Sequence, residues 1–165
     1  MESRLAKSKK IKTLNELKRI VRAAKKMRKK IVFTNGCFDI IHFGHVSYLK
    51  KCKELGSVLI VGLNSDSSVR RIKGRGRPVT KERERSIVLS ALESIDYVTI
   101  FGDSTPGRII TSLTPDILVK GGDWRKKDIV GADHVKRFGG RVVTVPFVKG
   151  YSTTSLIERI KKISG

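Results

Sequence analysis

The sequence is poor in acidic residues, aromatic residues and cysteines, and each shortage narrows what the protein can do. Asp and Glu number 15 against 36 Lys and Arg, which gives a net charge of +21. Cys37 and Cys52 are too few for a disulfide framework or a cysteine-rich metal site, so we expect a reducing cytoplasm. No apolar run approaches the roughly 20 residues of a membrane span, and the basic N-terminus lacks the apolar segment of a secretory signal.

The positive charge is concentrated in residues 1–30, which hold thirteen Lys or Arg and two Glu. Such a segment can bind nucleic acid, or it can be a helix with a solvated basic face. Aromatic residues make up 6% of the chain and none lies in this segment, so it lacks platforms on which bases could stack. We therefore favour the solvated helix. We divide the chain into a basic tail and N-terminal helix over 1–30 and a main domain over 31–165.

A capping box over 13–16 predicts the start of this first helix. Apolar residues then recur at helical spacing and predict a face that packs on the main domain: Leu14, Leu17, Ile20, Val21, Ala24 and Met27. We expect residues 1–12 to form a mobile tail.

From Ile31 onward, strand-like and helix-like segments alternate. The expected strands cover 31–34, 58–63, 97–101, 117–119 and 142–146. The expected helices cover 43–54, 66–72, 80–92, 106–113, 128–138 and 152–163, with Thr80 as the cap of the third. This alternation predicts a Rossmann-like, doubly wound α/β fold with about five parallel strands and helices on both faces.

Polar segments follow four of these strands, where ligands bind in such a sheet. They are residues 34–45, 64–66, 120–124 and 149–155. In the first, His42 and His45 flank Gly44 at the expected start of a helix. Two imidazoles at a helix N-terminus can hold a polyphosphate and stabilise charge that develops in a transition state. Cys37 in the same segment is a possible nucleophile, but we favour a small buried filler.

The other loops each allow two interpretations. Residues 152–154 bring three hydroxyls to a helix start, which is either a phosphate site or an ordinary helix cap. The sequence KGGDW at 120–124 is either a plain turn or part of a nucleotide site. In the second interpretation its Lys supplies a cation, its two Gly let the backbone approach the nucleotide closely, and its Asp supplies a carboxylate. The sequence KGRGRP at 73–78 is either a solvated charge run or a loop that closes over phosphates.

The segment GCFDIIHFGH resembles the HxGH signature of the nucleotidyltransferase superfamily, which includes class I aminoacyl-tRNA synthetases and cytidylyltransferases. Over about 31–163 the ordered set NGCFDIIHFGHVSYL, LNSD, KGRGRPV, ALESIDYV, TPDILVKGGDW, DIVGA and GYSTTSLIERI is similar to the D-glycero-β-D-manno-heptose 1-phosphate adenylyltransferases. The resemblance implies in-line transfer of AMP from ATP to the sugar 1-phosphate, with Mg²⁺ bound mainly through the ATP phosphates and no protein metal site.

The resemblance also assigns residues. The catalytic set would be His42, His45, Lys73 and Arg85. The nucleotide would contact Thr34, Asn35, Gly36, Cys37, Phe38, Gly44, Asn64, Lys120, Gly121, Asp123, Ser152, Thr153, Thr154 and Ser155. The sugar phosphate would contact Asp39, Arg77 and Trp124. By analogy with relatives we expect a homodimer.

Two departures from related patterns bear on the acceptor. Relatives that act on glycerol phosphate carry an Arg-Thr pair where this chain has Phe147 and Val148, so that branch is less favoured. The heptose enzyme is often fused to a sugar kinase, and from the chain length we expect the stand-alone form with a separate kinase. The alternatives are a cytidylyl- or adenylyltransferase acting on glycerol 3-phosphate or FMN and, less favoured, a basic nucleic-acid-binding protein.

Overall fold

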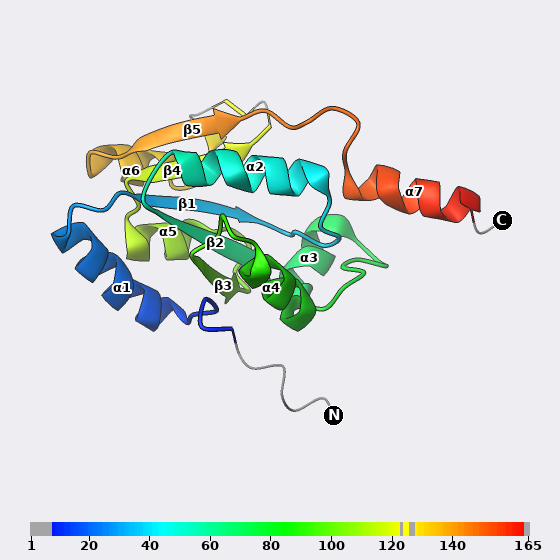
Figure 1. Ribbon diagram of the computed structural model, residues 1–165, viewed down its shortest axis with the longest axis horizontal. Helices are drawn as coiled ribbons and strands as arrows, with labels where there is room; N and C mark the ends of the chain where they lie inside the picture. The colour runs from blue at the N-terminus through cyan, green and yellow to red at the C-terminus, as the bar shows by residue number, and fades with distance from the viewer. Residues whose placement is uncertain (1–7, 123, 126–127, 164–165) are drawn as a thin grey trace.

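The computed structural model describes residues 8–122, 124–125 and 128–163. Its centre is a parallel sheet in the order β3-β2-β1-β4-β5 (Figure 1). The strands are β1 (Ile31–Gly36), β2 (Val58–Asn64), β3 (Tyr97–Phe101), β4 (Ile117–Gly121) and β5 (Arg141–Val145). The chain builds outward from β1 to β3 and then returns to β4 on the other side of β1. The expected doubly wound fold is confirmed, with its switch point between β1 and β4.

Helices cover both faces of the sheet. They are α1 (Leu14–Lys26), α2 (Phe43–Glu54), α3 (Asp66–Lys73), α4 (Glu82–Ala91), α5 (Gly107–Leu113), α6 (Ala132–Arg137) and α7 (Thr153–Ile163). Successive side chains of a strand point to opposite faces, so Ile31 and Phe33 pack with α1, α5 and α6, whereas Val32 packs with α2 and α4. Helix α7 extends away from this body at the right of Figure 1 and has no buried residue.

The N-terminal segment is more firmly attached than we expected. The backbone N–H of Lys12 donates to Val98 O at 2.8 Å, and Val98 N–H donates to Lys10 O at 2.9 Å. Ile11 thereby adds a parallel bridge at the β3 edge. The prediction of a mobile tail is wrong for residues 8–12, because this edge strand offers unpaired backbone groups that the segment satisfies. Residues 1–7 lie outside the described part of the chain.

Three local expectations are also wrong. Lys81, not Thr80, caps α4, because the Thr80 backbone and hydroxyl bind Asp39 instead. Helix α6 begins at Ala132, not at 128, because Gly131 has a φ of 85° that no α-helix accommodates. Met27 caps the end of α1 and is 67% exposed, outside the packed face. The capping box at Thr13 and Glu16 is confirmed. The other bounds of the elements differ from expectation by at most two residues. Within the described residues, no helix has the length and apolar character needed to cross a bilayer.

Candidate active site

The predicted polar segments meet where β1 and β4 end. His42 caps the N-terminus of α2, and its carbonyl accepts the backbone N–H groups of His45 and Val46. The two imidazoles stack, with centroids 3.8 Å apart and an interplanar angle of 28°. Nδ1 of each ring is buried and has no hydrogen-bond partner. The structure therefore presents a pair of closely packed histidines at the positive end of a helix dipole.

Both histidines favour their neutral forms in this arrangement. Burial lowers the pKa of His42. Burial, with a smaller contribution from neighbouring His42, lowers the pKa of His45 to about 4, and the backbone of Ile40 opposes this shift. The pair is thus uncharged at neutral pH. An anion bound beside the rings would favour the protonated form and raise both pKa values.

Gly44 brings the start of α7 to this pair. A Cβ at Gly44 would lie 3.1 Å from atoms of the His42 ring and 3.1 Å from Cβ of Tyr151. The Tyr151 ring also contacts Phe43, with centroids 5.0 Å apart. The N-terminus of α7 follows directly, so two helix N-termini converge near the histidines. This convergence suits a ligand with several negative charges.

The hydroxyls at the start of α7 partly satisfy one another. Ser155 N–H donates to Ser152 Oγ at 3.0 Å, and Ser152 N–H donates to Ser155 Oγ at 3.1 Å. The cap interpretation of this segment is therefore realised in this structure. A ligand at this helix end would have to exchange these bonds for its own, whereas no such bond involves the side chains of Thr153 and Thr154 among those described.

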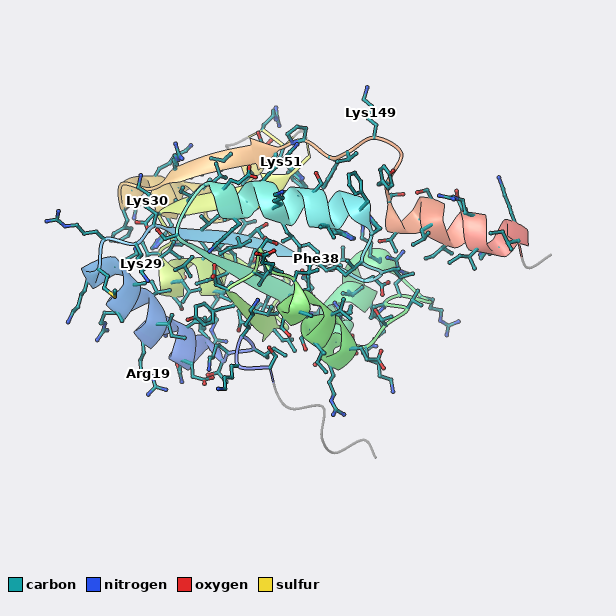
Figure 2. All side chains as sticks on the ribbon, viewed as in Figure 1. Arg19, Lys29, Lys30, Phe38, Lys51 and Lys149 are labelled. Carbon is teal, nitrogen blue, oxygen red and sulfur yellow. The ribbon has the colours of Figure 1, made fainter. Side chains whose placement is uncertain are left out.

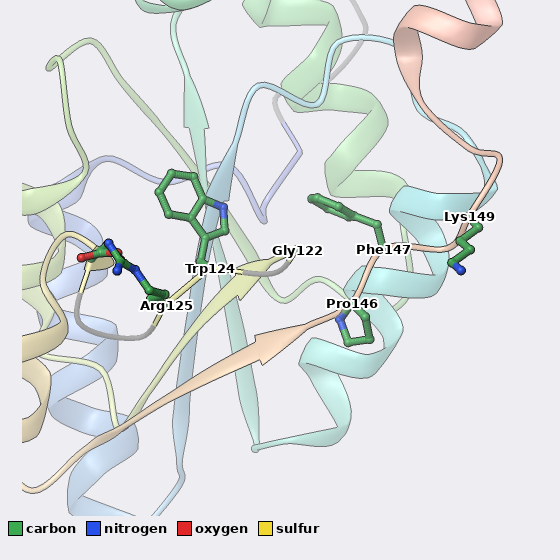
Figure 3. Close-up of a pocket in the computed structure, with 7 residues that line it drawn as sticks. Gly122, Trp124, Arg125, Pro146, Phe147 and Lys149 are labelled. Carbon is green, nitrogen blue, oxygen red and sulfur yellow. The ribbon is translucent and has the colours of Figure 1, made fainter.

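A cavity of about 600 Å³ opens beside the end of β4 (Figure 3). Its lining residues are Gly122, Trp124, Arg125, Asp128, Pro146, Phe147 and Lys149. Trp124 and Phe147 lie on either side of Gly122 (Figure 3). Phe147 packs closely on the glycine pair, since a Cβ at Gly121 would lie 2.5 Å from its ring and one at Gly122 2.8 Å. The cavity thus offers two aromatic faces and cationic groups, a combination that suits a nucleobase.

Lys120 lies between this cavity and the end of β1. Its Nζ sits 5.7 Å from the centroid of the Trp124 ring, and burial lowers its pKa. With Asn35 it lines a second cavity of about 70 Å³. Burial raises the pKa of the Cys37 thiol despite the nearby charges of Lys73, Arg85 and Arg77. Cys37 is therefore a thiol rather than a thiolate, in line with a filler and not a nucleophile.

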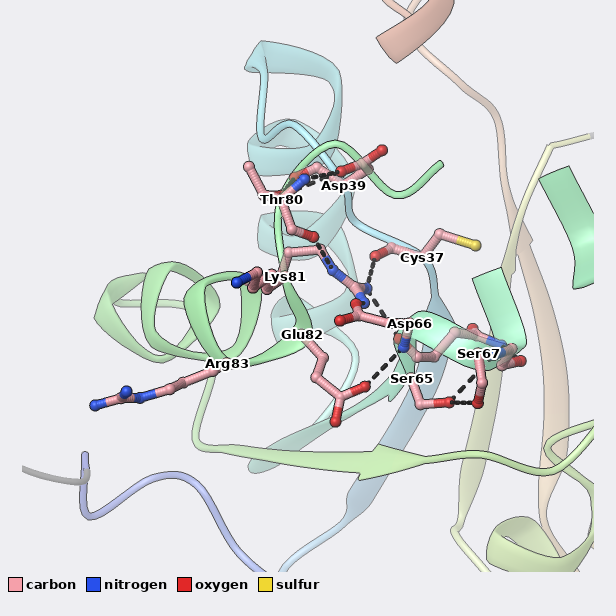
Figure 4. A network of polar contacts seen from close by, with 12 residues as sticks. Cys37, Asp39, Ser65, Asp66, Ser67, Thr80, Lys81, Glu82 and Arg83 are labelled. Carbon is pink, nitrogen blue, oxygen red and sulfur yellow. Dashed lines mark hydrogen bonds and ion pairs between the residues drawn. The ribbon is translucent and has the colours of Figure 1, made fainter. Parts of the chain in front are cut away.

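Arg85 ties the loops of the site together from within; its partners Cys37, Asp66 and Thr80 are labelled in Figure 4. The residue is 1% exposed. It donates to the backbone carbonyls of Cys37, Asn64 and Thr80 at 2.6, 2.9 and 3.0 Å. Its remaining nitrogen forms an ion pair with Asp66 at 2.6 Å. These contacts assign Arg85 to holding the loops after β1 and β2 in place, since its donors point at protein acceptors.

Asp39 forms the second clamp. It accepts from Arg77 Nε at 2.7 Å and from the backbone N–H groups of Val79 and Thr80 at 2.9 and 3.0 Å. Burial acts to raise the pKa of Asp39, but these hydrogen bonds outweigh it and lower the pKa. The carboxylate anchors the KGRGRP loop to the end of β1. Lys73 is both the last residue of α3 and the first of this loop, and it is exposed.

Some of the expected ligand residues face inward. The Thr34 hydroxyl is buried and lies 2.7 Å from the Tyr48 hydroxyl. Asn64 is buried and donates to Ser68 Oγ. Asp123 lies outside the described residues. Three further residues contact the site without having been expected to do so, namely Tyr48, Phe147 and Tyr151. In the sequence, Tyr151 lies directly before the hydroxyl run and Phe147 at the position of the arginine in glycerol phosphate relatives, whereas Tyr48 carried no such signal.

The described residues do not form a magnesium site by themselves. Nowhere among them do three His, Cys, Asp or Glu side chains gather closely enough to hold a metal ion. The carboxylates of Asp39 and Asp66 are paired with Arg77 and Arg85.

Comparison with known proteins identifies the family of this chain. Residues 33–159 match the family model described as cytidylyltransferase-like. The bifunctional protein HldE of Geobacter metallireducens is 54% identical over 156 residues, which are 94% of this chain and 32% of that protein. This chain thus spans about a third of the length of the curated relative it matches.

Solved structures agree on the fold. A lipopolysaccharide core biosynthesis protein from Thermoplasma volcanium is 29% identical with a TM-score of 0.59, covering 75% of this chain and 99% of that chain. Pantothenate synthetase from Thermus thermophilus has a TM-score of 0.65 at 14% identity and covers 93% of this chain and 70% of that chain, which shows the fold alone. With its HxGH segment at the switch point of the sheet, the chain belongs to the cytidylyltransferase-like family of nucleotidyltransferases.

Proposed function

We propose that this chain transfers the adenylyl group of ATP to D-glycero-β-D-manno-heptose 1-phosphate and releases pyrophosphate and ADP-heptose. The stacked His42–His45 pair at the α2 N-terminus, beside the start of α7, is the observation that carries this proposal. The segment-by-segment resemblance to the heptose 1-phosphate adenylyltransferases supports the choice of acceptor. The relation to HldE and to a lipopolysaccharide core biosynthesis protein supports it further.

The proposed reaction needs no covalent enzyme intermediate. A phosphate oxygen of the sugar 1-phosphate attacks the α-phosphorus of ATP. The bond from that phosphorus to the oxygen bridging the β-phosphate breaks, and pyrophosphate leaves with the electron pair. A phosphate monoester is already largely ionised at neutral pH, so no protein base has to remove a proton. The protein's contribution is positioning and stabilisation of charge.

The histidines would supply the charge stabilisation. Since Nδ1 of both rings is buried, Nε2 is the nitrogen through which each would donate to a phosphate oxygen. The neutral rings have a low cost of desolvation before the substrate binds, and the triphosphate then favours their protonated, positively charged forms. Donors fixed in advance toward the α-phosphate stabilise the transition state without reorganising.

The neighbouring loops would complete the substrate sites. We infer that the base enters the cavity between Trp124 and Phe147, so that Trp124 contacts the base and not the sugar phosphate as expected from sequence. Lys120 and the start of α7 would approach the phosphates. Lys73 would approach the phosphates from the KGRGRP side. Arg77 would form one wall of the acceptor site while its Nε keeps its hydrogen bond to Asp39. We further propose a homodimer in the cytoplasm, by analogy with relatives.

The acceptor is the least constrained part of the proposal. Glycerol 3-phosphate with CTP, and FMN with ATP, are the alternatives within the family. Phe147 stands where the glycerol phosphate branch carries an arginine, and it covers two glycines rather than presenting a cation. This observation favours the sugar phosphate.

The direct test measures pyrophosphate release by the purified protein with Mg²⁺. ATP and CTP are each crossed with heptose 1-phosphate, glycerol 3-phosphate and FMN. We expect release with ATP and heptose 1-phosphate. Release with a different pair alone would replace the proposed substrates while keeping the chemistry, and no release with any pair would contradict the proposal.

His45→Ala tests the assigned chemistry. We expect turnover to fall by at least about a hundredfold, the scale of losing one preorganised charge stabiliser. The matched control is His134→Ala, because His134 pairs with Thr114 at the opposite end of the strands. Turnover within a few-fold of the parent in a folded His45→Ala protein would remove His45 from the mechanism.

A further inference from the structure

Phe38 adopts a backbone conformation that bulky residues avoid. Its φ is +42°, in the left-handed region where a side chain crowds its own carbonyl. Its ring is nevertheless only 5% exposed and belongs to the buried cluster beneath α2. Glycine would relieve this strain, so the ring must supply something that glycine cannot.

The residues on either side hold Phe38 in this conformation. The Cys37 carbonyl accepts from Arg85 at 2.6 Å, and the Asp39 carboxylate accepts from the Val79 and Thr80 backbone (Figure 4). Arg85 and Asp39 are both buried. The turn therefore cannot relax without breaking buried polar contacts, and the direction of the Phe38 side chain is fixed.

That direction points the ring at the histidine pair. The ring centroids of Phe38 and His45 lie 5.4 Å apart, with planes at 59°. The other side of the ring rests on Gly36, where a Cβ would come within 2.9 Å of it. An aromatic series thus runs from Phe38 through His45 to His42.

Nδ1 of His45 contributes no hydrogen bond that would fix the imidazole. A catalytic or metal-bound histidine is normally oriented by a hydrogen bond to its second ring nitrogen. Here Nδ1 of His45 is buried without such a partner, as is Nδ1 of His42. The Ile40 backbone offers His45 a hydrogen bond, so the packing of Phe38 and His42 against the ring sets its orientation together with that contact.

We propose that Phe38 is a positioning residue, whose ring, driven by the strained turn, holds His45 in the orientation that the transfer step requires. This inference rests on the proposed function, in which His45 donates to the α-phosphate. It gives the left-handed turn a role, since a relaxed turn would direct the side chain elsewhere.

The test combines Phe38→Leu, which removes the ring face, with Gly36→Ala, whose methyl group would displace the ring. The control is Phe33→Leu, the same substitution at a residue buried on the other face of the sheet. Thermal unfolding first establishes that each variant is folded at the assay temperature. We then measure kcat, the KM for ATP, and the titration of His45 by NMR, with its signal identified by its loss in His45→Ala.

For Phe38→Leu and Gly36→Ala we expect kcat to fall about tenfold to a hundredfold, as for a misplaced reacting group, with the KM for ATP changing by less than about threefold. We also expect the pKa of His45 to rise from about 4 toward its ordinary value in both, because water reaches the ring. Phe33→Leu should show neither effect. An unchanged kcat and titration in folded Phe38→Leu, beside an inactive His45→Ala, would overturn this inference alone. An active His45→Ala would overturn the proposed function first.

Discussion

At the scale of single residues, His45 couples the site to the stability of the fold. Burial lowers its pKa to about 4, against about 6.5 in the unfolded chain. Between these values the unfolded chain binds more protons, so stability rises with pH. We expect the free energy of unfolding to fall by about 1–2 kcal/mol as the pH falls from 6.5 to 4, less than the full shift because the ring is partly exposed to solvent. Urea unfolding across this pH range measures the change in the free energy of unfolding. If that free energy depended on pH equally in His45→Ala, the pH dependence could not be assigned to His45.

Arg85 is the residue whose removal should disturb the site most broadly. Its guanidinium serves three carbonyls and one carboxylate at once, which a lysine ammonium cannot reproduce. We expect Arg85→Lys to lower the free energy of unfolding by about 3 kcal/mol, the cost of leaving buried partners unpaired, and to lower turnover as well. Arg83→Lys is the control, since Arg83 is exposed and points away from the network (Figure 4). Equal stability of the two variants would show that the network contributes little.

At the scale of elements, α1 packs on the core of the main domain, as expected. Leu17 is fully buried, and with Val21 and Ala24 it packs in the cluster that includes α5 and α6. We expect Leu17→Ala to cost about 2–5 kcal/mol of stability, whereas Asn15→Ala on the exposed face should cost well under 1 kcal/mol. Chemical denaturation compares them. A small loss for Leu17→Ala would mean that α1 is only loosely held, and that deleting residues 1–30 is a fair test of their role.

Elements were predictable from sequence where local patterns decide them. The bounds of α2 and β3 agree with expectation, because their apolar spacing and flanking Gly and Asp residues act locally. The start of α6 was not predictable from sequence, because the conformation of Gly131 depends on its packing against Ile110. Within the site, the spacing of His42 and His45 was enough to predict that the two histidines lie together at the start of a helix. The pairing of Asp39 and Arg85 with protein groups was not predictable, because all of these partners except the Thr80 carbonyl that Arg85 binds lie about 20 to 50 residues away in sequence.

At the scale of the whole molecule, the basic N-terminal surface and the candidate site lie at opposite ends of the strands. Residues 25–30 lead into the start of β1, whereas His42 and His45 follow its end. Figure 2 shows Arg19, Lys29 and Lys30 on the α1 side and Lys149 on the far side near α7. The positive charge near the site attracts anionic substrates over the screening length, whereas the α1 face is too distant to contribute strongly.

This separation allows the basic face to be tested without deleting it. In Arg19→Glu/Arg22→Glu/Lys26→Glu all three positions are exposed, and each reversal changes the charge by two, so +21 becomes +15. We expect the unfolding midpoint to stay close to that of the parent, because the core face of α1 is intact. The rate of pyrophosphate release should stay within about twofold, because the Debye length is about 8 Å at physiological salt. Binding to duplex DNA, measured against salt concentration, is the parallel assay. A solvated face predicts weak binding in the parent. Tight binding that the triple variant loses, with a salt slope smaller by about three, would instead make nucleic acid a partner of this surface.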